Sequence, residues 1–410
     1  MKIAIVSMDT RGGVQPYVAL ARGLCEAGHE VRAIAPADLA SMFEGSGASI
    51  ATLSASIESV VRGTSATEKG ALASIALAAR ELPKRIGTFT REALAACEGV
   101  DVITGGIGGM VVALSVAEKV GARFVETHLQ PVGASTDAYP GAMFAGVPSW
   151  SGALGMRASH WLSEQAIWLP FAPLMKRARR EVLGLSGAAR AHLGQPVLYG
   201  FSPRVVPVPA AGEGQRARIV TGYWFLPAPA AWRPSPELEA FVSAGGPLVS
   251  IGFGSMSSDD PAKVTELVAS AVRSVGARAV LLSGWGALRE VSGGDLFCAE
   301  AIPHDWLFAK MKAVVHHGGA GTTGASLRSG AVSIVVPFTM DQPFWAARVE
   351  QLGVGPTPIA RKKLDRDSLA RALDRALSDR AMQARASELG EAIRGEDGVG
   401  NAVRAFNALA

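Results

Sequence analysis

Residues 314–326 read VVHHGGAGTTGAS, a β-branched run that ends at two histidines and passes through glycines into a segment typical of a helix start. A strand that ends in glycines at a helix start directs bare N–H groups and the positive end of the helix dipole toward one point, which suits a phosphate. Metal suits it less, because adjacent histidines project to opposite sides of a strand and no carboxylate or cysteine is suitably spaced. Close helix-to-strand packing through glycine is the alternative, and the turn alone leaves both open.

Two further glycine loops follow predicted strands, at residues 8–16 and 252–258. The chain has no GxGxxG after its first strand and no GxxxxGK[ST], which disfavours a dinucleotide-dependent dehydrogenase and a P-loop ATPase. The pattern therefore predicts a different class of nucleotide-using protein.

Composition narrows the class further. The chain has 410 residues, which predicts two domains or three. Its 40 basic and 36 acidic residues give a net charge of +4 and are scattered, so no nucleic acid partner is expected. The cluster KRARR at 176–180 is interpreted as a solvated helix face, with contact to anionic lipid or substrate as the alternative.

Cysteines and the N-terminal segment predict the compartment. Cys25, Cys97 and Cys298 are widely separated and lack metal spacing, as expected of buried thiols in a reducing compartment. The apolar start is only a strand's length, so we expect neither a signal peptide nor a membrane span. A cytoplasmic protein is predicted, with at most a weak peripheral membrane contact; its oligomeric state is left open.

Strands alternate with amphipathic helices along the whole chain, which predicts an α/β fold with doubly wound parallel sheets. In the first half, strands are expected at 2–7, 101–106 and 122–127, and helices at 64–98 and 152–185. The tryptophan- and leucine-rich part of the last helix is interpreted as core, with the lining of an apolar pocket as the alternative.

Prolines cluster between residues 203 and 236 and indicate the inter-domain connection. We predict a Rossmann-like N-terminal, acceptor-binding domain at 1–210, a Pro-rich linker at 211–236, a Rossmann-like C-terminal, nucleotide-sugar-binding domain at 237–385 and a C-terminal helix at 386–410. Two such domains facing each other leave a cleft beside the carboxyl ends of both sheets, where ligands of α/β sheets bind.

The run IPHDWLFAKMKAVVHHGGAGTTGASLRSGAVSIVVPFTMDQPFWAARV (302–349) resembles the donor-binding signature of GT-B nucleotide-sugar glycosyltransferases of the UDP-glucosyl/glucuronosyltransferase-like superfamily. It is similar to bacterial sterol-glucosyltransferase-like and glycopeptide or macrolide enzymes. The segments TRGGVQPYVAL (10–20) and VTGYWFLP (220–227) extend the resemblance over both halves. It implies metal-independent, inverting transfer of a hexose such as glucose from a UDP- or dTDP-sugar to a lipophilic hydroxyl, without a resident cofactor. Natural products, as in antibiotic biosynthesis, and sterols are the implied acceptors.

The same resemblance implies a set of donor-binding residues. The diphosphate would meet one loop and its flank, made of His317, Gly319, Ala320, Gly321, Thr322, Gly254 and Ser255. The implied nucleotide-sugar-binding residues also include Thr10, Arg11 and Gly12 of the first glycine loop. The nucleobase would lie near Ile302, with Trp285 and His304 as neighbours or as core residues. Asp341 and Gln342 match an acid–amide pair that binds sugar hydroxyls, and a helix cap is the alternative for Asp341.

The general base is where this chain departs from the family. The sterol and glycopeptide enzymes have an aspartate directly after the arginine–glycine pair, and plant relatives a histidine, whereas Gly13 stands here. We take Asp9, in the same loop, as the first candidate base, with Asp137 and His128 in reserve. The alternatives are that Asp9 caps the helix expected near Gln15 or pairs with Arg11, or that an acidic acceptor reacts unaided.

Three functions remain open from the sequence. Besides a glycosyltransferase, the chain fits a nucleotide-sugar epimerase or a catalytically weak homologue that activates a partner. Residues 40–90 and 128–165 are expected to shape the acceptor pocket but do not identify the acceptor. The adjacent Asp259 and Asp260 do not make the spaced carboxylate motif of metal-dependent transferases and are interpreted as helix caps.

Overall fold

The computed structural model describes residues 1–54, 85–133, 135–208, 216–254, 260–284, 288 and 293–409. Ser255, Trp285 and Asp259 lie outside the described residues, as does most of the helix expected at 64–98 and of the acceptor-pocket segment 40–90. The chain divides into two compact units: unit 1 is Met1–Leu226 with Asp397–Ala410, and unit 2 is Pro227–Glu396.

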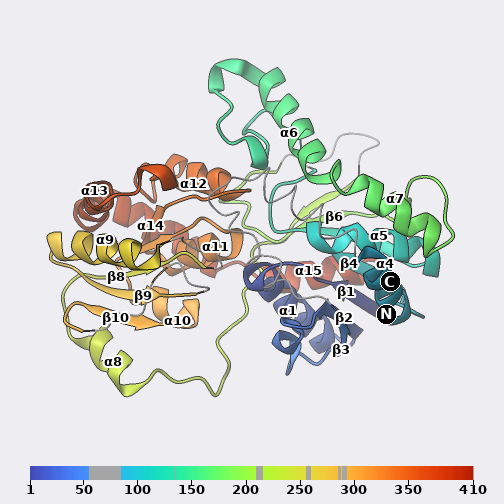
Figure 1. Cartoon of the computed structure of the whole chain (residues 1–410), viewed down its shortest axis with the longest axis horizontal. Coiled ribbons are helices and arrows are strands. Elements are labelled where there is room, and N and C mark those ends of the chain that lie inside the picture. Colours follow the sequence, from blue (N-terminus) through green and yellow to red (C-terminus); the bar gives the residue numbers. More distant parts are fainter. Residues whose placement is uncertain are drawn as a thin grey trace. The chain divides into compact units, whose positions relative to one another are not determined.

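Unit 1 is built on a seven-stranded sheet in the order β3-β2-β1-β4-β5-β6-β7, whose strands run parallel throughout (Figure 1). The strands are Lys2–Val6 (β1), Glu30–Pro36 (β2), Ser49–Leu53 (β3), Val102–Gly105 (β4), Arg123–His128 (β5), Val197–Tyr199 (β6) and Arg218–Val220 (β7). The central strands β1 and β4 are buried almost throughout, as their unbroken apolar runs predict for a parallel sheet.

Six α-helices belong to the described part of unit 1. They are Arg11–Glu26 (α1), Ile86–Ala96 (α4), Ile107–Val120 (α5), Gly152–Trp168 (α6), Ala172–Glu181 (α7) and Gly398–Asn407 (α15), with 3₁₀ turns at Ala40–Phe43, Ala142–Phe144 and Ser149–Ser151. The C-terminal α15 is held in unit 1, where Asn401 Nδ2 donates to the Thr221 carbonyl at 2.7 Å and Asn407 Oδ1 bonds His29 Nε2 at 2.7 Å.

Unit 2 has a five-stranded parallel sheet in the order β10-β9-β8-β11-β12. Its strands are Leu248–Gly252 (β8), Arg278–Leu282 (β9), Leu296–Ala299 (β10), Ala313–His316 (β11) and Val332–Val335 (β12). Its helices are Pro236–Ser243 (α8), Pro261–Ser274 (α9), His304–Phe308 (α10), Ala320–Ser329 (α11), Gln342–Gln351 (α12), Arg366–Ser378 (α13) and Arg380–Arg394 (α14), with a 3₁₀ turn at Arg361–Lys363.

The structure corrects several local expectations. Helix α1 begins at Arg11 rather than near Gln15, and the helix expected over 152–185 is two helices that break around Pro170, whose ring cannot continue the hydrogen-bond ladder. Three short strands, β3, β6 and β10, were not predicted. Asp260 caps α9 as expected, because its Oδ1 accepts from Lys263 N at 3.0 Å.

Two interpretations of unit 1 surfaces were wrong in part. Arg179, in the KRARR cluster, is buried rather than solvated and pairs with Glu118 at 3.0 Å. Conversely, Trp161 of α6 is 60% exposed and does not belong to the core. Only Cys97 of the three free cysteines is fully buried.

Candidate functional site: a glycine-lined histidine in unit 2 and a carboxylate loop in unit 1

His317 follows β11 and its ring lies between two glycines that are far apart in the sequence. A Cβ added to Gly254 would lie 2.8 Å from His317 Cε1, and one added to Gly319 would lie 2.5 Å from its Nε2. Gly254 also has φ +63° and Gly318, next to the histidine, has φ +90°, both in the left-handed region that favours glycine. Glycines are therefore required at these positions to make room for the imidazole of His317. This role is more specific than close packing of a helix against a strand.

Burial keeps both histidines of the pair neutral. It lowers the pKa of His317 to about 4, with the charge of His304 adding to the effect, and lowers the pKa of His316 to about 3. His316 Nδ1 accepts from Gly318 N at 3.1 Å, whereas the buried Nδ1 of His317 has no hydrogen-bond partner. His316 Nε2 is buried without a hydrogen-bond partner as well. His316 Nδ1 thus serves the turn, and His317 is the histidine whose ring lies against the two glycines.

The helix that follows supplies the N–H groups. Gly319 is the N-cap of α11 in extended conformation and makes no side-chain cap bond, and Ala320, Gly321 and Thr322 form the first turn. The first four N–H groups of an α-helix have no partner within the helix. Gly319, Gly321 and Thr322 are partly exposed, so this turn presents N–H groups and the positive helix end beside His317.

Asp341 and Gln342 stand at the start of α12, after a strained residue. Met340 has φ 59°, the one positive φ outside glycine among the described residues. Gln342 Oε1 accepts from Phe338 N at 2.7 Å and from Thr339 N at 3.1 Å, and so holds the loop in that conformation. Asp341 makes no capping bond; its Oδ2 accepts from Trp345 Nε1 at 2.8 Å, which orients the carboxylate.

The segment expected to meet the nucleobase lies at α10. Ile302 is buried in the core of unit 2, and the His304 ring stacks on Phe308 with centroids 4.3 Å apart. The loops after β8 and β9 touch, since a Cβ on Gly284 would lie 2.2 Å from the Gly254 carbonyl oxygen. The side chain of Ile302 serves packing in this core, and a nucleobase contact through its backbone groups stays a prediction.

In unit 1, the loop after β1 brings the carboxylate of Asp9 against Gly13. A Cβ added to Gly13 would lie 2.3 Å from Asp9 Cγ and within 2.7 Å of both carboxylate oxygens. Asp9 Oδ1 accepts from Thr10 N at 2.7 Å, and Thr10 rather than Asp9 is the N-cap of α1. Arg11 and Gly12 are exposed in the first turn of this helix. The carboxylate of Asp9 thus occupies the space of the side chain that Gly13 lacks.

The two reserve candidates for the base lie in different surroundings. The Asp137 side chain is 54% exposed and forms a surface ion pair with Arg157 at 3.5 Å. His128 ends β5, is buried, and its Nε2 donates to Glu126 Oε1 at 3.3 Å, leaving Nδ1 without a partner. Nothing in the contacts of Asp137 indicates a base, whereas His128 carries an acceptor nitrogen.

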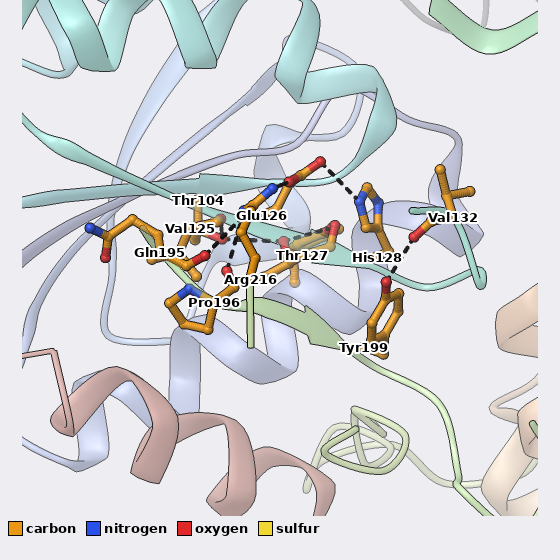
Figure 2. A network of polar contacts seen from close by, with 11 residues as sticks. Thr104, Val125, Glu126, Thr127, His128, Val132, Gln195, Pro196, Tyr199 and Arg216 are labelled. Atoms are coloured by element: carbon orange, nitrogen blue, oxygen red, sulfur yellow. Dashed lines mark hydrogen bonds and ion pairs between the residues drawn. The ribbon is translucent and has the colours of Figure 1, made fainter. Parts of the chain in front are cut away.

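His128 belongs to a charged network that the sequence did not reveal. Figure 2 shows Glu126 between His128 and Arg216, whose guanidinium forms an ion pair with it. Burial alone raises the pKa of Glu126, but the hydrogen bonds and charges of His128 and Arg216 outweigh it and lower the pKa to about 2. These residues line a pocket of about 350 Å³, together with Val132, Gly133, Glu164, Trp168, Val197 and Arg218. Only the spacing of Glu126 and His128 on one face of a strand could have suggested it.

The described residues include no helix long and apolar enough to cross a membrane. Two parallel α/β sheets, each with glycine loops after its strands, define a GT-B fold protein.

Comparison with known proteins supports this class. Residues 287–398 match the family model of the "Erythromycin biosynthesis protein CIII-like, C-terminal domain". The chain is 33% identical to the sterol 3-beta-glucosyltransferase of Aspergillus clavatus over 422 aligned positions, which cover 99% of this chain and 29% of that protein. The chain thus spans less than a third of the length of this curated relative.

Solved structures agree in fold. The glycotransferase of kitacinnamycin has a TM-score of 0.71 at 20% identity, covering 99% of this chain and 98% of its own. The Streptomyces sp. SF2575 glycosyltransferase SsfS6, complexed with thymidine diphosphate, has a TM-score of 0.66 at 18% identity and covers 100% and 99%. The chain has the GT-B fold, is similar in sequence to sterol 3-beta-glucosyltransferases and matches the erythromycin CIII-like model over residues 287–398, which confirms the resemblance drawn from residues 302–349.

Proposed function

We propose that the chain transfers a sugar from a UDP- or dTDP-sugar to a hydroxyl of a lipophilic acceptor, with inversion at the anomeric carbon. The observation that carries this proposal is the His317 ring between Gly254 and Gly319 at the N-terminus of α11; His317 and α11 lie inside residues 287–398, which match the family model. Similarity to sterol 3-beta-glucosyltransferases supports a lipophilic acceptor. That SsfS6 was solved with thymidine diphosphate supports a nucleoside diphosphate donor.

In this scheme unit 2 stabilises the leaving group. As the bond between the anomeric carbon and the phosphate oxygen breaks, its electron pair passes to the diphosphate. The N–H groups of the first turn of α11 and the imidazole of His317 meet the added negative charge, because they are fixed before the reaction and need no reorganisation. Asp341, oriented by Trp345, and Gln342 are assigned to the sugar hydroxyls.

Unit 1 supplies the base. The acceptor oxygen attacks the anomeric carbon on the side opposite to the diphosphate, and its proton passes to the carboxylate of Asp9. The position of that carboxylate over Gly13 supports Asp9 as the substitute for the missing family residue. His128 stays second, since its Nδ1 is buried, and Asp137 third, because an exposed arginine already pairs with it.

A panel of UDP- and dTDP-sugars, assayed for transfer to sterol, polyketide and phenolic acceptors, tests the proposal. Product with an inverted anomeric configuration is expected from at least one donor and acceptor pair. Nucleotide-sugar isomerisation without an acceptor would instead favour an epimerase. Nucleotide binding with no turnover of any kind would favour the second candidate, a catalytically weak homologue that activates a partner, for which Gly13 in place of the family base is the supporting observation.

The chemistry proposed needs neither a resident metal nor a cofactor, because the diphosphate charge is met by protein dipoles. A reducing, cytoplasmic location is proposed as well, supported by the three free cysteines.

A further inference from the structure

Helix α6 has its polarity inverted relative to an ordinary surface helix. Its buried residues are Met156, Ser159, His160, Ser163 and Ile167. Its exposed residues are Ala153, Leu154, Arg157, Ala158, Trp161 and Leu162. Leu154 is 85% exposed and Trp161 60%, so two large apolar side chains point to solvent, while two serines and a histidine are buried along with Met156 and Ile167.

The buried polar side chains hold the helix in this orientation. Ser159 Oγ accepts from Gly141 N at 2.8 Å, Ser163 Oγ accepts from Met143 N at 3.3 Å, and His160 Nε2 donates to the Tyr139 carbonyl at 3.0 Å. Turning α6 to bury Trp161 would break these bonds and leave buried groups unsatisfied, which is costly. These hydrogen bonds therefore fix the orientation in which the apolar face of α6 points to solvent.

Exposed apolar side chains are concentrated on this segment of the molecule. Among the described residues, six of the eight large exposed hydrophobics fall in 26 residues of sequence: Phe144, Trp150, Leu154, Trp161, Leu162 and Leu169. Figure 1 shows α6 standing away from the sheet of unit 1, with α7 continuing it. Leu154, Ala158, Trp161 and Leu162 are spaced i, i+4, i+7 and i+8 and therefore share one face of α6. An exposed apolar helix face of this kind is typical of an interaction site.

Cations accompany the apolar face. Arg157 lies on α6 with its side chain 65% exposed and pairs with Asp137 at 3.5 Å, whereas Lys176, Arg177 and Arg180 are exposed on α7. Glu181 is the one acidic residue of α7 and pairs with both exposed arginines, so α7 keeps a positive surplus. Tryptophan and leucine beside lysine and arginine are the composition of helices that lie in the headgroup region of a bilayer.

We propose that the outward face of α6, with the exposed cations of α7, docks on an anionic phospholipid surface. A second copy of the chain fits less well, because an isologous contact would bring the same cations face to face, whereas anionic headgroups neutralise them. The biological reason for docking rests on the proposed function. A lipophilic acceptor dissolves in a bilayer, and docking on the membrane would bring the enzyme to that acceptor.

Flotation of the full chain with vesicles tests the proposal. Vesicles of phosphatidylcholine containing roughly a third phosphatidylglycerol should carry the protein upward, while pure phosphatidylcholine or high salt should weaken binding. The double variant Leu154→Glu/Trp161→Glu should lose at least about tenfold in vesicle affinity. Leu193→Glu is the matched control, because Leu193 is 58% exposed in unit 1 outside this helix, and it should bind like the parent.

The variant Lys176→Gln/Arg180→Gln should lose the dependence on phosphatidylglycerol and keep the apolar part of binding. Unchanged far-UV circular dichroism and melting temperature would show that each variant folds. Parent-like flotation of Leu154→Glu/Trp161→Glu, or no flotation of the parent, would overturn the proposal. Loss of self-association in sedimentation, or a raised KM for a soluble acceptor, without any vesicle binding would assign the face to a second copy or to the acceptor and overturn it equally.

Failure of this inference is distinguishable from failure of the proposed function. Flotation is measured without donor or acceptor, so vesicle binding by a chain that transfers no sugar would support the docking surface and count against the glycosyltransferase. Sugar transfer to soluble acceptors by a chain that never binds vesicles would do the reverse.

Discussion

The carboxylate of Asp9 and the Cα of Gly13 are so close that no side chain fits between them: a Cβ on Gly13 would lie 2.3 Å from Asp9 Cγ. The two residues are four positions apart: Asp9 lies in the loop that leads into α1, and Gly13 lies in the first turn of that helix. Placing an aspartate at residue 13, as the family pattern suggests, would therefore displace Asp9. The two carboxylates are alternatives, and a gain-of-function test needs Asp9→Gly and Gly13→Asp in the same chain.

The first prediction uses this contact. Asp9→Asn should lower kcat with an alcohol acceptor about 10²-fold or more and leave donor affinity nearly unchanged. Gly13→Ala should lower kcat in the same direction, because its methyl group must push the carboxylate aside. Gly87→Ala in α4 is the control, since a Cβ there would meet no atom closer than 3.8 Å. Steady-state kinetics with alcohol and phenol acceptors measure this, and full alcohol transfer by Asp9→Asn would pass the role to His128 or Asp137.

The second prediction concerns the donor. UDP or dTDP should raise the melting temperature of the chain by mass action, and His317→Ala should reduce that shift. Gly254→Ala should also reduce it, because its Cβ would lie 2.8 Å from the His317 ring, and Gly321→Val should abolish it by blocking the backbone approach. His29→Ala in unit 1 is the matched histidine control. Parent-like shifts in the His317 and Gly321 variants would rule out the α11 loop as the phosphate site.

The third prediction is a pH dependence of stability. Burial lowers the pKa of His317 to about 4 and that of His316 to about 3, below the usual value near 6.5 in an unfolded chain. The unfolded chain thus binds more protons as pH falls from about 6.5 toward 4, so stability is fully present above this window and is lost within it. Each of the two histidines should lower the free energy of unfolding by about 2 kcal/mol at pH 5. Urea unfolding between pH 7 and 5 should show a smaller loss for His317→Gln; an identical loss would contradict the buried neutral imidazole.

The fourth prediction concerns Arg179, which was expected on a solvated helix face but is buried. Arg179 donates to both oxygens of Glu118, to Ser115 Oγ and to two backbone carbonyls, and its side chain is 5% exposed. Arg179→Met should therefore lower the free energy of unfolding of the chain by about 2–3 kcal/mol. Arg180→Met, on the neighbouring side chain with 71% exposure, should cost less than about 0.5 kcal/mol. Similar denaturation midpoints for the two variants would contradict the buried network.

The fifth prediction is that sugar transfer survives excess EDTA. The reason is that the N–H groups of the α11 first turn and the helix dipole are aligned to meet the diphosphate charge. Initial rates before and after chelation measure it, with a metal-dependent transferase as the positive control for the chelator. Loss of activity that Mg²⁺ or Mn²⁺ restores would refute the dipole-based scheme.

Local patterns were sufficient where the physics is local. The apolar runs and their helical spacing predicted the β1-α1-β2 unit and the strand β11, because burial on both sheet faces is written in the side chains themselves. The short strands β3, β6 and β10 were missed, since so few residues carry too weak a periodicity to separate them from loops.

By itself, then, the sequence determined the alternation of strands and helices and the glycine turn at His317, while the phosphate site there and the missing base at Gly13 stay predictions. Only the tertiary structure decided which residues meet across long separations. It brought Gly254 onto His317, Arg216 onto Glu126 and the C-terminal α15 back to unit 1, and it turned the apolar face of α6 outward. These outcomes depend on packing between distant segments, and a residue's type and immediate neighbours carry no record of which distant residue will come to lie against it.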